Sequence, residues 1–142
     1  VDAVPLWKPQ NTTVLSSIQL NGETAYTTYS GGTTSERFVD YLRNILIPTL
    51  SPDSIVVMDN MRSHHTQAVK DLLKQSGVQY LYLPPYSPDL NPIEKMWSKL
   101  KAFLRKAKGR LLEKLPDAVR AAFKTISSHD CSGWFRFCGY SQ

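Results

Sequence analysis

Two acidic residues occupy positions at which a carboxylate could bind a metal ion. Asp59 ends the apolar run 54–58, and Glu94 falls in the first turn of a predicted helix. Ligand sites in α/β proteins gather at the carboxyl ends of strands, and Mg²⁺ prefers oxygen ligands. Each residue also has a purely structural interpretation. Asp59 and Asn60 can cap a turn, and a carboxylate at Glu94 stabilises the helix dipole.

A basic segment follows Glu94 in the same predicted helix. Seven basic residues lie between Asn91 and Arg110 against a single acid, although the whole chain carries a net charge of only +5. Helical spacing places one row of side chains on a common face: Glu94, Ser98, Lys101, Arg105 and Lys108. Such a row predicts contact with a polyanion, and the alternative is a solvated helix face.

A pair of carboxylates beside a phosphate-binding track would suit two-metal phosphodiester chemistry. In that chemistry one ion activates the attacking water or 3′-hydroxyl, and the other stabilises the leaving oxygen. The His residues near Asp59 do not indicate zinc, because no Cys or His partner lies at ligand spacing.

The elements that would position these residues follow from hydrophobic patterning. Asn21-Gly22 joins two strand-like runs, and Thr33 with Glu36 has the spacing of a capping box for a helix that closes at Pro48. The run ending at Asp59 is typical of a strand buried on both faces. The predicted strands cover 14–20, 24–29, 54–59 and 78–83, and the later predicted helices cover 66–75, a segment from Pro92 and 116–126. This order predicts an α/β domain around one mixed sheet, with residues 1–142 as a single domain.

Composition limits the class of protein. No apolar run is long enough to span a bilayer, so no membrane association is expected. Cys131 and Cys138 are too few for a disulfide framework, which favours unpaired thiols in a reducing cytoplasm. The first residues have neither Met nor a signal-like apolar core, so we expect a truncated or internal start.

Two longer motifs resemble the mariner-type transposase superfamily, and within it the bacterial insertion-sequence branch. They are VVMDNMRSHH at residues 56–65 and LPPYSPDLNPIE at residues 83–94, and the ending GWFRFCGY at residues 133–140 is also similar. The resemblance covers the chain from about Trp7 onward. It implies a ribonuclease-H-like fold and an Asp-Asp-Glu triad. The second Asp and the Glu of that triad match Asp59 and Glu94, which 34 residues separate.

The resemblance also implies an activity and partners. The expected activity is metal-dependent hydrolysis of phosphodiester bonds at transposon ends, followed by transfer of the freed 3′ ends to target DNA. Two Mg²⁺ or Mn²⁺ ions are the expected cofactors. The expected partners are transposon-end and target DNA and further copies of the chain in a homo-oligomer. The expected location is the bacterial cytoplasm, with association to the nucleoid when DNA is bound.

Other residues are expected to support the site or contact DNA. Asn60 is expected to orient Asp59, and His64 or His65 either approaches the phosphate or metal shell or lies on the surface at a helix start. Asp89 and Asn91 are expected to shape the loop rather than bind metal. Trp97 is expected in the core. The expected DNA contacts are Lys95, Lys101, Arg105, Lys108 and, with its role left open, Tyr86.

The first Asp of the family triad has no match in this sequence. In the family it lies on a central strand upstream of the region that matches Trp7, and Asp2 is too close to the predicted hairpin to align with it. We therefore expect the first strand and first carboxylate to be absent, with two strand edges left unpaired or paired by an upstream polypeptide. The N-terminal DNA-binding part usual in the family is also absent from the match. The main alternative is a catalytically inactive DNA-binding remnant. A nuclease unrelated to transposition is a third interpretation, which leaves the loop motif unexplained.

Overall fold

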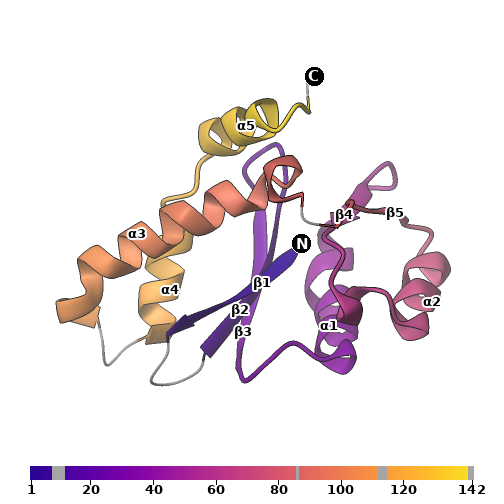
Figure 1. The fold of residues 1–142 in the computed structure, drawn as a ribbon, viewed down its shortest axis with the longest axis horizontal. Coiled ribbons are helices and arrows are strands. Elements are labelled where there is room, and N and C mark those ends of the chain that lie inside the picture. Colours follow the sequence, from indigo (N-terminus) through magenta and orange to yellow (C-terminus); the bar gives the residue numbers. More distant parts are fainter. Residues whose placement is uncertain (8–11, 86, 112–114, 141–142) are drawn as a thin grey trace. The chain divides into compact units, whose positions relative to one another are not determined.

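The computed structural model describes residues 1–7, 12–85, 87–111 and 115–140 and divides the chain into two compact units (Figure 1). The first unit comprises Val1–Ser17 and Ala25–Ser87, and the second comprises Ile18–Thr24 and Pro88–Gln142. Among the described residues, no helix has both the length and the apolar character needed to cross a membrane.

A three-stranded sheet contains the predicted hairpin. Its strands are β1 (Asp2–Trp7), β2 (Thr12–Ile18) and β3 (Thr24–Ser30), in the order β1-β2-β3. The hairpin between β2 and β3 is confirmed, and Gly22 in its turn has a φ of +96° that suits glycine.

Strand β1 was not predicted from the sequence. It pairs antiparallel with β2, with Asp2 opposite Ser16 and Val4 opposite Val14. The register shifts after Pro5, which has no N–H to donate to the ladder. The prediction that this edge of β2 is unpaired is therefore wrong. The backbone nitrogen of Val1 also donates to the carbonyl oxygen of Val57, at 3.0 Å.

A separate two-stranded parallel sheet carries the predicted strand that precedes Asp59. Strands β4 (Ile55–Met58) and β5 (Gln79–Tyr82) pair with Met58 opposite Tyr82, and α2 (Gln67–Gln75) connects them. Among the described residues the strands thus form two sheets and not the single mixed sheet expected. The prediction that this strand is buried on both faces is also wrong, because Ile55 on its outer face is 57% exposed.

Helix α1 (Ser35–Tyr41) supplies the centre of the core in the first unit. Its cap is Thr34, which accepts from the Arg37 N–H, and not Thr33, whose hydroxyl instead bonds the Tyr29 hydroxyl. The chain continues through a π-helical turn (Leu42–Leu46) and a 3₁₀ turn (Ile47–Thr49) that contains Pro48. The core packs residues of α1 and the π turn against those of β4 and α2, namely Phe38, Tyr41, Leu42, Leu46, Val56, Met58, Val69 and Leu73.

The second unit contains three helices, α3 (Ile93–Leu111), α4 (Leu115–Lys124) and α5 (Ser128–Phe137). The apolar face predicted for α3 is confirmed, and it includes Trp97 at 2% exposure. Its buried residues are Ile93, Met96, Trp97, Leu100 and Leu104. Cys131 and Cys138 are free and buried, and burial raises the pKa of the Cys131 thiol to about 11.

Helix α5 was missed, although the sequence carries a signal for it. The Ser127 hydroxyl accepts from the Asp130 N–H, and the Asp130 carboxylate accepts from the Ser127 N–H, so a complete capping box begins the helix.

The turn at Gly22 gives a test of packing in the second unit. A Cβ at Gly22 would lie 2.7 Å from the Cα of Ser128, whereas a Cβ at Gly139, where φ is +93°, would meet nothing within 4 Å. Both positions share a backbone strain of about 1–2 kcal/mol on substitution. Gly22→Ala should therefore lower the free energy of unfolding by about 1–3 kcal/mol more than Gly139→Ala does. Chemical denaturation measures this difference, and equal losses would contradict the contact with Ser128.

Candidate active site

The carboxylate of Asp59 lies directly after β4 and is held by two hydrogen-bond donors. Its Oδ1 is 2.9 Å from Nδ1 of His64 and 3.2 Å from the backbone nitrogen of Met61. The 3₁₀ turn Arg62–His64 brings the imidazole back to the strand end, and its first bond joins the His64 N–H to the Met61 carbonyl. The Asp59 side chain stays 28% exposed, so it is fixed by the protein and still open to solvent.

His64 is a core residue. Its side chain has no exposed surface, and its ring stacks on Phe38 with 4.1 Å between centroids. Its Nδ1 also lies 3.4 Å from the Asp59 carbonyl oxygen. Because Nδ1 faces only acceptors, it carries the hydrogen. The interpretation of this residue as a surface histidine at a helix start is therefore wrong.

Asn60 and His65 form a second pairing alongside the first. The side-chain oxygen of Asn60 bonds Nε2 of His65, whose ring stacks on Tyr82 at 3.8 Å. The Tyr82 hydroxyl donates to the carbonyl oxygen of His64 at 2.5 Å. Burial raises the pKa of this hydroxyl, which keeps it a donor. Asn60 thus braces the turn after β4 through His65 and β5.

Glu94 lies in the first turn of α3 and is half-buried. Asn91, itself 6% exposed, begins this helix by accepting at its side-chain oxygen from the Ile93 N–H and at its carbonyl from the Glu94 N–H. Asp89 is exposed in the 3₁₀ turn Pro88–Leu90, and the Leu90 carbonyl oxygen accepts from the Tyr140 hydroxyl at 2.7 Å. These contacts fix the start of α3. Tyr86 lies outside the described residues.

The chemistry of both carboxylates fits a hard divalent cation, since each offers oxygen ligands and neither is fully buried. Asp59 belongs to the first unit and Glu94 to the second. Within the described ranges, no group of three or more His, Cys, Asp or Glu side chains comes together as a metal site. Asp59 and Glu94 stay the predicted metal ligands on the strength of the sequence motifs.

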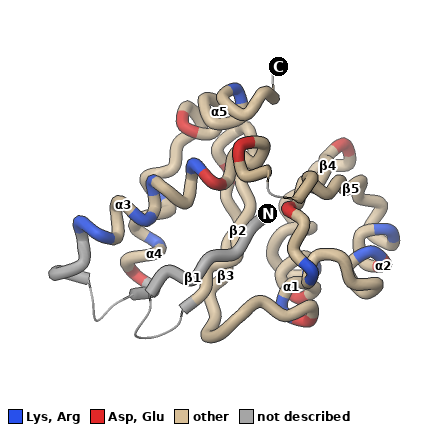
Figure 2. The backbone as a smooth tube through the Cα atoms, in the orientation of Figure 1, with Lys and Arg blue, Asp and Glu red and all other residues tan. Residues whose placement is uncertain are grey.

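The basic side chains of α3 do not all face the same way. Figure 2 shows Lys and Arg distributed along this helix. On the row that begins at Glu94, the side chains of Ser98, Lys101 and Arg105 are exposed. Lys108 lies on the same helix, but its side chain falls outside the description. This face can meet a polyanion.

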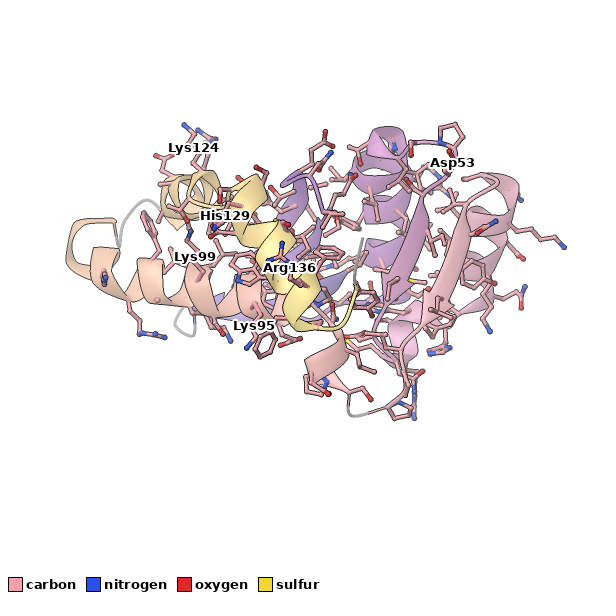
Figure 3. All side chains as sticks on the ribbon, turned by 90° about the horizontal axis from the view of Figure 1, so that it is seen from above. Asp53, Lys95, Lys99, Lys124, His129 and Arg136 are labelled. Atoms are coloured by element: carbon pink, nitrogen blue, oxygen red, sulfur yellow. The ribbon has the colours of Figure 1, made fainter. Side chains whose placement is uncertain are left out.

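Two lysines of α3 point instead to α5 (Figure 3). The ammonium of Lys95 lies over the Phe137 ring, 4.1 Å from its centroid. Lys99 donates to the Thr125 carbonyl oxygen at 2.8 Å and to the Asp130 carboxylate at 2.5 Å. Lys99 therefore joins α3 to α5 and to the residue that follows α4, and its charge is compensated by Asp130. Lys95 lies about 100° around the helix from Glu94, off the row.

Three functional contacts had no local signal in the sequence. Phe38 stacks on His64, and Tyr82 stacks on His65. Asp130 binds Lys99. In each pair the two residues are far apart in the sequence.

The pair between Lys99 and Asp130 makes stability depend on pH. The hydrogen bond from Lys99 holds the pKa of Asp130 below its ordinary 3.8. Because the folded pKa is depressed, this stabilisation is complete above the unfolded pKa and is lost as pH falls through the folded one. Asp130→Asn should therefore be less stable than the parent at pH 7, and the gap should shrink as pH drops below 3.8.

Chemical denaturation from neutral to acidic pH measures this gap. The control is Asp117→Asn, because Asp117 meets Arg120 at 3.7 Å and both side chains are more than half exposed. Such pairs contribute little. A gap for Asp130→Asn that does not change with pH would rule out the ion pair as its cause.

Comparisons with known proteins identify the family and the fold of the chain. The sequence profile of a family described as DDE superfamily endonuclease matches residues 6–115. The Tcb1 transposable-element transposase of Caenorhabditis briggsae is 31% identical over 99 residues, covering 66% of this chain and 36% of that protein. The Tcb2 transposase of the same organism is 33% identical over 76 residues, covering 49% and 28%. The chain thus spans about a third of the length of these curated relatives.

Solved structures share the fold. The catalytic domain of Mos1 transposase, solved with raltegravir and Mg, gives a TM-score of 0.69 at 18% identity, covering 95% of this chain and 74% of that one. A Mos1 mariner paired end complex with Mn gives 0.64 at 22% identity, covering 88% and 40%. The mixed α/β fold of the chain therefore matches the ribonuclease-H-like catalytic domain of Mos1.

Proposed function

The chain belongs to the DDE superfamily endonuclease family, and on that premise we propose that it is the catalytic part of a DNA transposase. It hydrolyses phosphodiester bonds at transposon ends and joins the freed 3′ ends to target DNA. One observation carries the proposal. Asp59, directly after β4, and Glu94, in the first turn of α3, both lie within residues 6–115, which the family profile matches. The residue motifs favour the bacterial insertion-sequence branch, and both units are assigned to one catalytic domain.

Asp59 and Glu94 are the proposed metal ligands, and Mg²⁺ or Mn²⁺ the proposed cofactor, with two ions in the complete site. Bound metal supplies an activated nucleophile and neutralises charge on the leaving oxygen. The Mg and Mn in the Mos1 structures support this choice. The first Asp of the triad is not assigned, and Asp2 receives no catalytic role.

The protein's own part is to hold these carboxylates and the DNA. The Met61 N–H bonds the carboxylate of Asp59, and Asn91 fixes the helix start that carries Glu94. Lys101 and Arg105 on the exposed face of α3 contact the phosphate backbone, and Lys108 and Tyr86 are proposed to extend that contact. Lys95, whose ammonium lies over the Phe137 ring, is left out of this face. The relatives include Mos1 complexes named for paired ends and for strand transfer, so we propose that a homo-oligomer holds two DNA ends.

Loss of either metal ligand tests the enzymatic proposal. Asp59→Asn and Glu94→Gln should each lower Mg²⁺- or Mn²⁺-dependent nicking of supercoiled plasmid by at least ~100-fold, because ligands matter at least as much as the groups that orient them. Asp89→Asn, which removes an exposed carboxylate of the same loop, is the matched control and should nick as the parent does. Unchanged nicking in either ligand variant would disprove its assignment.

The salt dependence of DNA binding tests the exposed face of α3. Lys101→Ala and Arg105→Ala should each reduce the slope of log K against log salt by about 0.9, the value for one lost phosphate contact. Lys106 is the matched control, because it is exposed on the same helix but about 100° around from Arg105. Fluorescence anisotropy with a duplex at several salt concentrations measures the slopes. Equal reductions of the slope for Arg105→Ala and Lys106→Ala would mean that DNA does not bind one particular face of α3.

A second candidate function is DNA binding without catalysis. It is favoured by the exposed lysine and arginine face of α3, which does not depend on either carboxylate. The nicking assay separates the two candidates. A folded chain that binds duplex DNA yet does not nick it with either metal would support DNA binding as the function of this chain and would exclude nicking by this chain.

A further inference from the structure

We propose that His64 is a positioning residue that fixes the carboxylate of Asp59 by joining it to the apolar core of the first unit. The proposal rests on the proposed role of Asp59 as a metal ligand. It concerns how the chain orients that ligand and assigns His64 no contact with metal or DNA.

A hydrogen bond joins the side chains of His64 and Asp59. The Nδ1–H of His64 points at Oδ1 of Asp59 over 2.9 Å, and the Met61 N–H reaches the same oxygen over 3.2 Å. Two donors that converge on one carboxylate oxygen restrict rotation about the Cβ–Cγ bond. They therefore define the direction in which the carboxylate faces.

The imidazole of His64 is itself anchored by packing. The ring is fully buried and stacks on Phe38, which has no exposed surface and belongs to the core of the first unit. Within the described part of the chain, Nε2 of His64 has no hydrogen-bond partner. The hydrogen bonds of the ring therefore run through Nδ1 to Asp59 alone, and its opposite side is held by packing.

The backbone of His64 is held by a residue of β5. The Tyr82 hydroxyl, from β5, donates to the His64 carbonyl oxygen. The neighbouring His65 ring lies on Tyr82 and bonds Asn60. The backbone is thus fixed from β5 while the ring is fixed from α1. The imidazole cannot shift without breaking the contacts of its backbone with β5 or the contacts of its ring with α1. The carboxylate of Asp59, which is bonded to this ring, is therefore held in place as well.

Removal of the Nδ1 donor should weaken metal binding, since groups that orient a metal ligand commonly contribute 10–100-fold in affinity. Asparagine and glutamine provide a matched pair. The amide of Asn places an N–H close to the position of Nδ1, whereas the longer Gln carries it to the position of Nε2. His64→Asn should keep Mn²⁺ affinity within a few-fold of the parent. His64→Gln and the apolar His64→Leu should lower it about 10–100-fold.

We would titrate the whole chain with Mn²⁺ and monitor binding by calorimetry and by electron paramagnetic resonance, which measure these affinities. Asp59→Asn separates the proposed metal role of Asp59 from the positioning role of His64. If Asp59→Asn binds Mn²⁺ as the parent does, or if the parent binds none, the proposed metal role of Asp59 fails. If Asp59→Asn loses affinity while His64→Gln and His64→Leu keep it, the positioning role of His64 fails and the metal role stands.

A metal-free measurement tests the bond directly, and its first readout uses the parent chain alone. Nitrogen-15 NMR of the parent chain should show a hydrogen on Nδ1 of His64, with its resonance shifted in Asp59→Asn. A neutral His64 ring with its hydrogen on Nε2, or an Nδ1 resonance that does not respond to Asp59→Asn, would overturn the proposal.

Discussion

A buried imidazole joins the core of the first unit to an acidic group at its surface. An unbonded polar ring in an apolar core is costly, and the bond from Nδ1 of His64 to Asp59 offsets part of that cost while the face of the ring packs on Phe38. The acid is thus fixed by the same contacts that close the core over β4. The Met61 N–H, which bonds Asp59, and the Tyr82 hydroxyl, which bonds the His64 carbonyl oxygen, also hold this turn.

The second unit depends on how α3 divides its surface. The apolar face is buried and the side chains of Ser98, Lys101 and Arg105 face solvent. Lys95 and Lys99 turn instead to α5. A charged lysine that bonds Asp130 and a backbone carbonyl contributes to helix packing and little to attraction of a polyanion. The number of basic residues in this segment is therefore larger than the number of basic side chains on α3 that face outward to contact DNA.

Much of the fold could be predicted because its signals are local. The hairpin follows from Asn21-Gly22, and α3 follows from one apolar periodicity. Strand β1 was missed because its pairing with β2 is tertiary, and Pro5 within it argues against a strand. Helix α5 was missed because Gly133 and several aromatic residues lower its intrinsic propensity, although Ser127 and Asp130 already had capping-box spacing.

For the candidate site, the sequence by itself determined the positions of the acids along the chain. Asp59 falls at a strand end and Glu94 in a first helical turn because period, caps and turn residues act over a few residues. Only the tertiary structure decided that His64 is buried and that Lys99 pairs with Asp130. Each outcome depends on a partner far along the chain, Phe38 for the one and Asp130 for the other. No local pattern encodes such contacts, because they exist only once distant segments have packed together.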